Sequence, residues 1–202
     1  MFNASATLNV SRLLYNPSLC LPHATFKSFD LLQIPFSFPT GNIKGVVLDK
    51  DNCFAKDHDD KIWPEYTETW KRLQDAYPKE NLLIVSNSAG TDDDIEHKQA
   101  EKLERDTGVT VLRHSTKKPG CHSEILDYFS ARGISNSEIV VIGDRLFTDI
   151  LMANMMGSWG IWLSDGVEQS QKLFPSLERN LYSRLVTNRE PQNRYNPPTP
   201  QE

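Results

Sequence analysis

Residues 44–53 read KGVVLDKDNC, a short apolar run that leads directly into two aspartates, Asp49 and Asp51. A short and continuous apolar run is typical of a strand that is buried on both faces of a sheet. The sequence therefore predicts a strand at Lys44–Asp49. Similar runs predict further strands at Leu82–Ser86, Val109–Arg113, Ile139–Gly143 and Gly160–Leu163.

Helical segments separate these runs. Pro64 suits the first turn of a helix, and the large apolar residues Tyr66, Trp70, Leu73 and Tyr77 recur at the spacing of one helix face. Strands that alternate with helices form parallel βαβ units, so the pattern predicts an α/β fold with a Rossmann-like, doubly wound parallel sheet. The other predicted helices are Asp92–Thr107, Pro119–Arg132, Leu146–Met156 and Leu173–Val186.

The composition limits the class of protein. The chain has 202 residues, of which 38% are hydrophobic, and this is enough for a folded core. Its formal net charge of -5 argues against a nucleic-acid partner, which would require a basic surface. No apolar run approaches the roughly 18 residues of a membrane-spanning helix, so we expect a soluble or peripheral protein. Three cysteines without a paired framework indicate a reducing compartment.

The sequence divides into three parts. Residues 1–42 hold four prolines among many Leu and Phe residues, so we expect an arm that either packs on the domain or lies in a lipid headgroup layer. The composition favours packing. Residues 43–190 form the predicted α/β domain, and the polar, proline-rich residues 191–202 are expected to be disordered. The segments between motifs are too short for an inserted domain of typical size, so we expect no large cap domain.

Polar residues follow four of the predicted strands. In a doubly wound sheet, ligands bind beyond the carboxyl ends of the strands, so we expect these side chains to meet at one edge of the sheet. Together they provide carboxylates, hydroxyl or amide donors, and a lysine, a combination that suits phosphoryl transfer. The candidate residues are Asp49, Asp51, Ser86, Asn87, Lys118, Asp144 and Asp149.

Each group has a chemical task in such a reaction. Asp49 is the candidate nucleophile, because an aspartyl-phosphate divides hydrolysis into two easier steps. Asp51 is placed to protonate the leaving oxygen and later to take a proton from water. Asp144 offers oxygen ligands, which favour Mg²⁺ over zinc. Ser86 and Lys118 would bind the phosphate oxygens.

These residues also carry a family resemblance. Asp49–Cys53, Ser86, Lys118-Pro119 and Gly143–Asp149 resemble the four motifs of haloacid dehalogenase superfamily phosphatases, in the same order. More narrowly, Leu48–Phe54, Asp59–Pro64, His114–Cys121 and Gly143–Ala153 resemble the fungal mitochondrial phosphatidylglycerophosphatases.

The resemblance implies a substrate, a cellular location and a set of metal ligands. It implies that phosphatidylglycerophosphate is dephosphorylated to phosphatidylglycerol for cardiolipin synthesis, at the matrix face of the mitochondrial inner membrane. It implies an aspartyl-phosphate on Asp49 and a Mg²⁺ ion held by Asp49, Asp144 and the main-chain carbonyl of Asp51. Asp149 matches a position that is either a ligand or a support.

The predicted absence of a cap domain bears on the substrate. An uncapped site gives access to an anchored lipid headgroup, but also to a phosphoprotein, a nucleic-acid end or a small phosphate ester. An inactive phosphate-binding module remains an alternative function, and a homo-oligomer remains open as the assembly state.

We expect Lys50 and Arg145 to contact the headgroup, within a positive rim that faces an anionic membrane. The rim comprises Lys44, Lys50, Arg113, His114, Lys117, Lys118 and Arg145.

Overall fold

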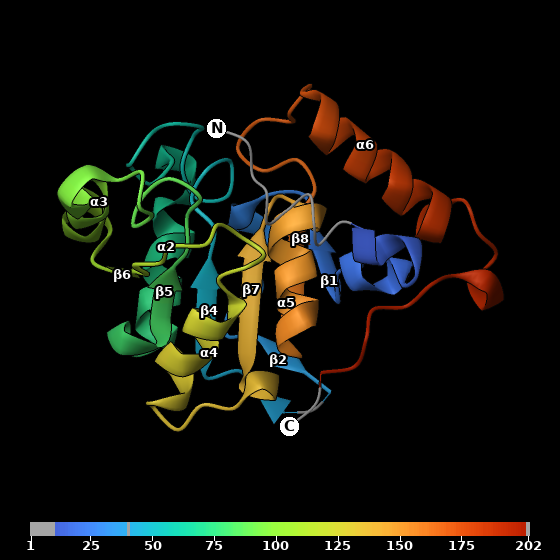
Figure 1. The fold of residues 1–202 in the computed structure, drawn as a ribbon, viewed down its shortest axis with the longest axis horizontal. Helices are drawn as coiled ribbons and strands as arrows, with labels where there is room; N and C mark the ends of the chain where they lie inside the picture. Colours follow the sequence, from blue (N-terminus) through green and yellow to red (C-terminus); the bar gives the residue numbers. More distant parts are fainter. Residues whose placement is uncertain (1–10, 40, 201–202) are drawn as a thin grey trace.

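The computed structural model describes residues 11–39 and 41–200. Its centre is a six-stranded parallel sheet with the strand order β1-β8-β7-β4-β5-β6 (Figure 1). A short antiparallel pair, β2 (Ser37–Phe38) and β3 (Gly41–Asn42), stands apart from this sheet. The sheet strands are β1 (Ala24–Phe26), β4 (Gly45–Leu48), β5 (Leu82–Ile84), β6 (Thr110–Val111), β7 (Ile139–Gly143) and β8 (Trp159–Leu163).

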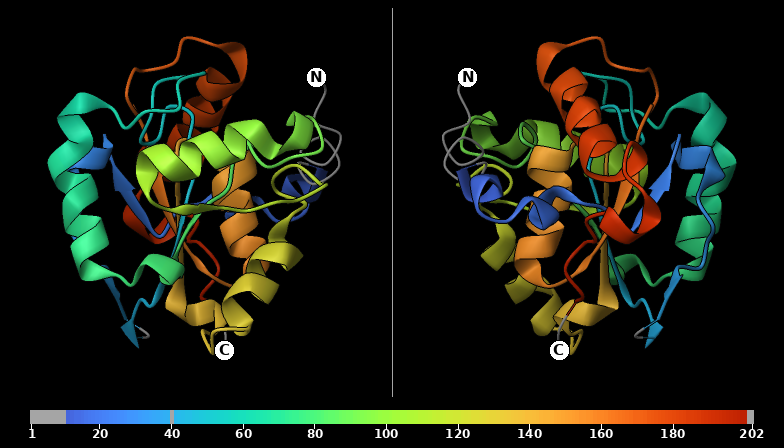
Figure 2. Two further views of the ribbon diagram at one scale, coloured as in Figure 1. Left: turned by 90° about the vertical axis from the view of Figure 1, so that its left-hand side faces the viewer. Right: turned by 90° about the vertical axis from the view of Figure 1, so that its right-hand side faces the viewer.

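Helices cover both faces of the sheet, as Figures 1 and 2 show. Helices α2 (Thr67–Ala76) and α3 (Lys98–Thr107) pack on one face, where Trp70 and Leu103 join the same buried cluster as Val46. Helices α4 (His122–Ser130) and α5 (Leu151–Met156) pack on the other face with Val47. The predicted doubly wound α/β fold is confirmed, and the described residues form no separate cap domain.

Successive residues of β4 point to opposite faces, and both faces are buried, which is why this strand is apolar throughout. The predicted apolar face of α2 is also confirmed, because Tyr66, Trp70, Leu73 and Tyr77 are all buried.

The first turns of two helices differ from their predictions. The helix expected from Asp92 starts at Lys98, because the Asp94 carboxylate accepts the backbone N–H groups of Gln99 and Ala100 and so satisfies the first turn. The helix expected from Leu146 opens with a π-helical turn before α5.

The N-terminal segment is part of the domain. Strand β1 pairs with β8 at the edge of the sheet, and Phe29, Leu32 and Phe36 are buried in the core that covers α2. The packing alternative is therefore correct for the described residues, and the domain begins well before the predicted boundary at residue 43. Residues 1–10 of the predicted arm lie outside the described part of the chain.

The C-terminal segment begins with a short 3₁₀ turn at Pro191–Asn193. The disorder expected for residues 191–202 stays a prediction. The carbonyl oxygen of Pro198 accepts a hydrogen bond from Nε2 of His23 at 2.8 Å, which ties this tail to the N-terminal segment. Residues 201–202 lie outside the described part.

The sheet order places the site. Strands β4 and β7 are neighbours at the centre, and the chain reverses its winding between them, so a crevice forms beyond their carboxyl ends. Asp49 and Asp144 follow these two strands directly. None of the helices in the described residues is long and apolar enough to cross a membrane.

If the N-terminal segment is part of the core, shortening one of its buried side chains should lower the stability of the protein. We expect Phe29→Ala to lower the free energy of unfolding by about 3–5 kcal/mol, because Phe29 is buried against Tyr66 and Trp70. Denaturant unfolding measures this. The control is Leu31→Ala at an exposed position two residues away, for which we expect a change within about 0.5 kcal/mol. Equal, small effects would show that the segment is only an appendage.

Candidate active site

Four charged side chains from distant parts of the chain meet beyond the central strands. The Lys118 ammonium lies 2.5 Å from Oδ1 of Asp49 and 2.7 Å from Oδ1 of Asp149. Asp49, Asp144 and Asp149 each place one oxygen within 4.8 Å of the others. The predicted convergence of these residues is thus found in the structure. We call these four residues the carboxylate–lysine cluster.

The local backbone explains how Asp149 reaches the cluster. Residues Leu146–Ile150 form a π-helical turn, in which the Asp149 N–H donates to the carbonyl of Arg145. The Asp149 carboxylate in turn accepts the Arg145 N–H at 3.1 Å. A Cβ atom at Gly143 would lie 2.4 Å from the Asp149 carboxyl carbon, so this position requires glycine. The backbone at the end of β7 therefore makes room for the buried Asp149 carboxylate and donates a hydrogen bond to it.

The electrostatics of the cluster are unbalanced. Burial raises the pKa of Asp49 to about 7, with Asp149 and Asp51 adding to the rise and Lys118 opposing it. The pKa of Asp144 is raised well above its usual range, first by burial and then by the charges of Asp49 and Asp149. For Lys118, burial lowers the pKa, but the two carboxylates outweigh burial and the net shift is upward.

The cluster fits a divalent cation. Three carboxylates against one ammonium leave an excess of two negative charges when all four groups are ionised. All the available ligand atoms are oxygens, which is the donor set of a hard ion such as Mg²⁺. Both oxygens of Asp149 already accept hydrogen bonds, from Lys118 and from the Arg145 N–H.

Asp51 has a separate set of partners. Its Oδ1 accepts the Lys50 ammonium at 2.7 Å and the backbone N–H of His58 at 2.9 Å. Lys50 is fully buried, and it also donates to the carbonyl of Asp59 at 2.8 Å. A buried ammonium with these partners cannot reach a lipid headgroup, so the structure corrects the prediction for Lys50. The side chain instead fastens the loop 54–63 to Asp51.

The predicted phosphate-binding residues occupy different depths. Asn87 lines the cavity, and its Oδ1 accepts the backbone N–H of Lys118 at 2.8 Å. Ser86 is fully buried outside that lining, and its hydroxyl lies 3.1 Å from Oγ of Ser88. Of the two adjacent lysines, Lys118 joins the cluster, whereas Lys117 pairs with Asp93 at 2.7 Å.

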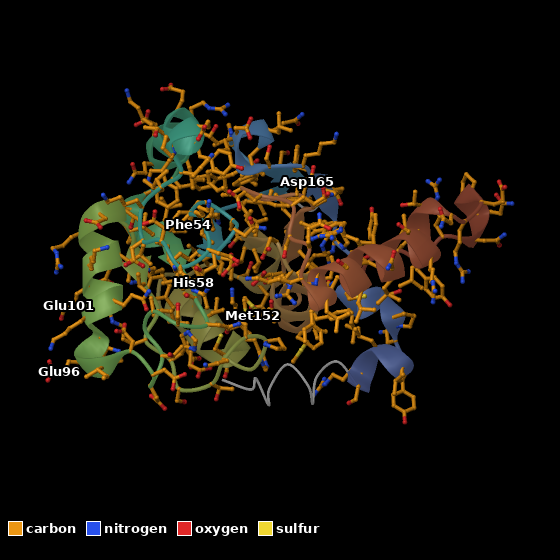
Figure 3. All side chains as sticks on the ribbon, turned by 90° about the horizontal axis from the view of Figure 1, so that it is seen from above. Phe54, His58, Glu96, Glu101, Met152 and Asp165 are labelled. Carbon is orange, nitrogen blue, oxygen red and sulfur yellow. The ribbon has the colours of Figure 1, made fainter. Side chains whose placement is uncertain are left out.

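The cluster lies at the bottom of a cavity of about 210 Å³. Asp49, Asp144 and Lys118 contribute to its wall. Two segments outside the motifs form the mouth, namely the loop 54–63 and the segment 170–175. Figure 3 looks onto this edge of the sheet, with His58 near the centre. From these two segments, the lining residues are Asp57, His58, Ser170, Lys172 and Pro175.

The sequence reasoning missed two residues that position the site. Asn52 donates to Oδ2 of Asp144 at 3.0 Å and accepts the backbone N–H of Glu168, so it joins the two sides of the mouth. The second is the buried Glu178, whose carboxylate accepts Nε of Arg145 at 2.9 Å. Glu178 lies on the same helical face as Leu181 and Leu185, and a charge on an apolar face was a readable signal.

The predicted positive rim does not form. Lys44 pairs with Glu138 at the amino ends of the central strands, on the opposite edge from the site. Arg113 pairs with Glu104, away from the cavity lining. Arg145 does line the cavity, so its contact with a headgroup stays a prediction.

The fastening role of Lys50 can be tested by its removal. We expect Lys50→Met to lower the free energy of unfolding by about 1–3 kcal/mol, because two carboxylates, Asp51 and Asp60, lose a buried cation. Denaturant unfolding measures the loss. Lys61→Met, an exposed lysine in the same loop, is the matched control and should change little. If both variants are equally stable, Lys50 does not hold the loop.

The sequence of this chain is similar to a known group of enzymes. The phosphatidylglycerophosphatase GEP4, mitochondrial, of Saccharomyces cerevisiae is 56% identical over 91% of this chain and 98% of that protein. A probable mitochondrial phosphatidylglycerophosphatase of Schizosaccharomyces pombe is 37% identical over 85% of this chain and 87% of that protein. An Arabidopsis thaliana phosphatidylglycerophosphate phosphatase 1 is 36% identical over 74% of this chain and 42% of that protein.

The sequence profile of one enzyme family, described as mitochondrial PGP phosphatase, matches residues 4–168. This range includes β1 and all four strand-end motifs, and it stops just before the segment that completes the mouth of the cavity. The narrower resemblance read from the sequence is thereby confirmed. The chain belongs to the mitochondrial PGP phosphatase family of enzymes.

Proposed function

We propose that this chain removes the terminal phosphate of phosphatidylglycerophosphate in mitochondria, at the matrix face of the inner membrane, and so supplies phosphatidylglycerol for cardiolipin synthesis. Family membership supports the substrate, and the names of two relatives support a mitochondrial location. The observation that carries the chemistry is the carboxylate–lysine cluster at the bottom of an open cavity.

In the first step, a carboxylate oxygen of Asp49 attacks the phosphorus atom, and the bond from phosphorus to the glycerol oxygen breaks. Asp51 gives its proton to the departing oxygen, so phosphatidylglycerol leaves as an alcohol. The Lys118 ammonium lies against Asp49, where it offsets the negative charge of the arriving phosphate.

In the second step, water attacks the phosphorus of the aspartyl-phosphate. Asp51 takes a proton from this water, the bond between phosphorus and the Asp49 oxygen breaks, and inorganic phosphate forms. Lys50 and the His58 N–H hold one oxygen of Asp51 throughout, so the other oxygen is available for both proton transfers. Asp49 and Asp51 are then restored to their starting states.

Asp49 and Asp144, with Asp149 beside them, would hold the Mg²⁺ ion. When bound, this ion polarises the phosphoryl oxygens and neutralises charge that develops on them. Lys118 draws Asp149 toward Asp49, and Asn52 orients Asp144, so the protein fixes the direction of each carboxylate. No histidine or cysteine joins this group among the described residues.

The size of the cavity bears on the substrate. At about 210 Å³ it can hold a phosphorylated glycerol headgroup, but it is smaller than a typical site for a whole lipid. The acyl chains would therefore stay outside the protein. A protein or nucleic-acid end could also present a phosphate to this opening, so the substrate needs a direct comparison.

The nucleophile assignment predicts a severe loss on substitution. We expect Asp49→Asn to reduce phosphate release from phosphatidylglycerophosphate by about a thousandfold or more, because an amide cannot form the aspartyl-phosphate. Phosphate release in the presence of Mg²⁺ measures this. Asp75→Asn, at an exposed position on α2, is the control and should retain full activity. Equal rates for native protein and Asp49→Asn would remove the assignment.

The same assay distinguishes the substrates. The native enzyme is offered phosphatidylglycerophosphate in vesicles, a phosphopeptide, and a short nucleic acid with a terminal phosphate. The proposal requires preferred turnover of the lipid. Preferred turnover of either other substrate would leave the mechanism standing and overturn the lipid specificity.

Mg²⁺ should stabilise the folded protein. We expect a gain of about 2.7 kcal/mol at a hundredfold excess over the dissociation constant, measured as a rise in Tm. Because protons compete for Asp49, whose pKa is about 7, the gain should be larger one unit above that pH than one unit below. Asp144→Asn should lose most of the gain, and an undiminished response in that variant would contradict the proposed site.

The metal-free protein should show the opposite dependence on pH. Folding raises the pKa of Asp49 above its ordinary value of 3.8, so the folded state holds a proton that the unfolded chain has lost. Stability should therefore fall as pH rises from about 4 to about 7 without Mg²⁺. The pH dependence of stability measured with Mg²⁺ and without it separates the effect of metal binding from that of proton binding.

A further inference from the structure

Helix α6 (Leu173–Tyr182) presents large apolar side chains to solvent. Leu173 is 70% exposed, Phe174 is 62% exposed and Leu177 is 47% exposed. Figure 1 places this helix above the carboxyl ends of the strands and to one side of the body. The three residues fall on adjacent positions of one helical surface, so they form a continuous apolar face. We call this the α6 outer face.

The opposite side of the helix is fixed to the domain. Glu178 is buried and binds Arg145 and the backbone N–H of Phe147. Leu181 packs against a buried cluster that includes Leu146 and Leu185. Because this inner side is held by buried contacts, the α6 outer face points away from the core.

More exposed apolar residues lie on a neighbouring segment. Leu14 and Tyr15 are strongly exposed, and they follow Leu13, which packs against the same buried cluster as Leu181. Figure 3 shows this N-terminal turn, in blue, beside α6. The exposed apolar residues thus lie on two segments that pack against the same buried cluster.

The same region is basic in an acidic protein. Residues 172–194 carry a charge of +3, against -5 for the whole chain. Most of the basic side chains are exposed, whereas the acidic Glu178 is buried. An apolar helix face flanked by exposed basic residues is the pattern of a helix that lies in the interface of an anionic bilayer. The basic residues are Lys172, Arg179, Arg184, Arg189 and Arg194.

We propose that the α6 outer face inserts into the headgroup region of an anionic membrane and holds the mouth of the active site against the lipid. The inference rests on the proposed function, because a lipid substrate keeps its acyl chains in the bilayer. Lys172 and Pro175 belong to the same segment and line the catalytic cavity. Docking through α6 therefore brings the cavity to the level at which the phosphate headgroups lie.

A bilayer fits this surface better than a second copy of the chain. A two-fold symmetric dimer brings the same patch of each copy together, so the basic segments would face each other and repel. An anionic lipid surface attracts each exposed Lys or Arg instead. The charge of the region therefore favours the membrane as the occupant.

The test is vesicle binding by the full chain. The double variant Phe174→Ser/Leu177→Ser should bind vesicles of equal parts phosphatidylcholine and phosphatidylglycerol about tenfold more weakly or worse, because two apolar anchors are lost. Sedimentation with vesicles measures this. Hydrolysis of a soluble phosphate ester should be unchanged, since neither residue lines the cavity. Ile95→Ser, which is 76% exposed on another segment, is the matched control and should bind normally.

A second variant guards against misfolding. Arg184→Glu/Arg189→Glu changes only exposed side chains, and it should also weaken binding to the anionic vesicles but not to vesicles of phosphatidylcholine alone. Undiminished vesicle binding in both double variants would overturn the proposal. So would a dimer of the native protein that dissociates on Phe174→Ser/Leu177→Ser, since the face would then cover a second copy. These vesicles contain no substrate, so the result does not depend on which phosphate ester the enzyme hydrolyses.

Discussion

The Lys118 ammonium, held between Asp49 and Asp149, is the interaction on which this active site depends. Two carboxylates buried side by side repel each other, and an unpaired buried charge costs several kcal/mol. The lysine offsets part of that cost for Asp49 and Asp149. The third acid, Asp144, accepts a hydrogen bond from the amide of Asn52. When all four groups are ionised, the cluster keeps an excess of two negative charges, which the proposed Mg²⁺ ion would neutralise.

Asp51 stands apart from this balance because Lys50 neutralises it locally. The two aspartates of one short motif therefore work in different surroundings, one inside the cluster and one beside it. Such a separation suits the proposed mechanism, in which one carboxylate attacks phosphorus and the other moves protons. The buried Lys50 also donates to the carbonyl of Asp59, which connects Asp51 to the loop at the mouth.

The surroundings of the site come from the two ends of the chain. The N-terminal segment supplies β1 and covers the edge of the sheet at β8, an edge that would otherwise offer unpaired backbone groups. The C-terminal segment supplies one wall of the cavity and the apolar, basic surface of α6. The central sheet thus carries the candidate site, the N-terminal segment covers an edge of the sheet, and the C-terminal segment forms one wall of the cavity.

The sequence by itself determined five strands of the sheet and the place of the candidate site. Apolar runs fixed the strands from β4 to β8, and the order of elements fixed the edge at which Asp49, Lys118 and Asp144 meet, because parallel strands share one carboxyl edge. Only the tertiary structure decided which polar side chains are exposed and which are buried. The sequence suggested that Lys50 is a surface charge, but it is buried and binds the Asp51 carboxylate and the carbonyl of Asp59, so it holds the loop at the mouth in place. The N-terminal segment has no regular hydrophobic period, so the sequence did not predict how it packs. It is buried through aromatic contacts with distant residues, such as those of Phe29 with Tyr66 and Trp70.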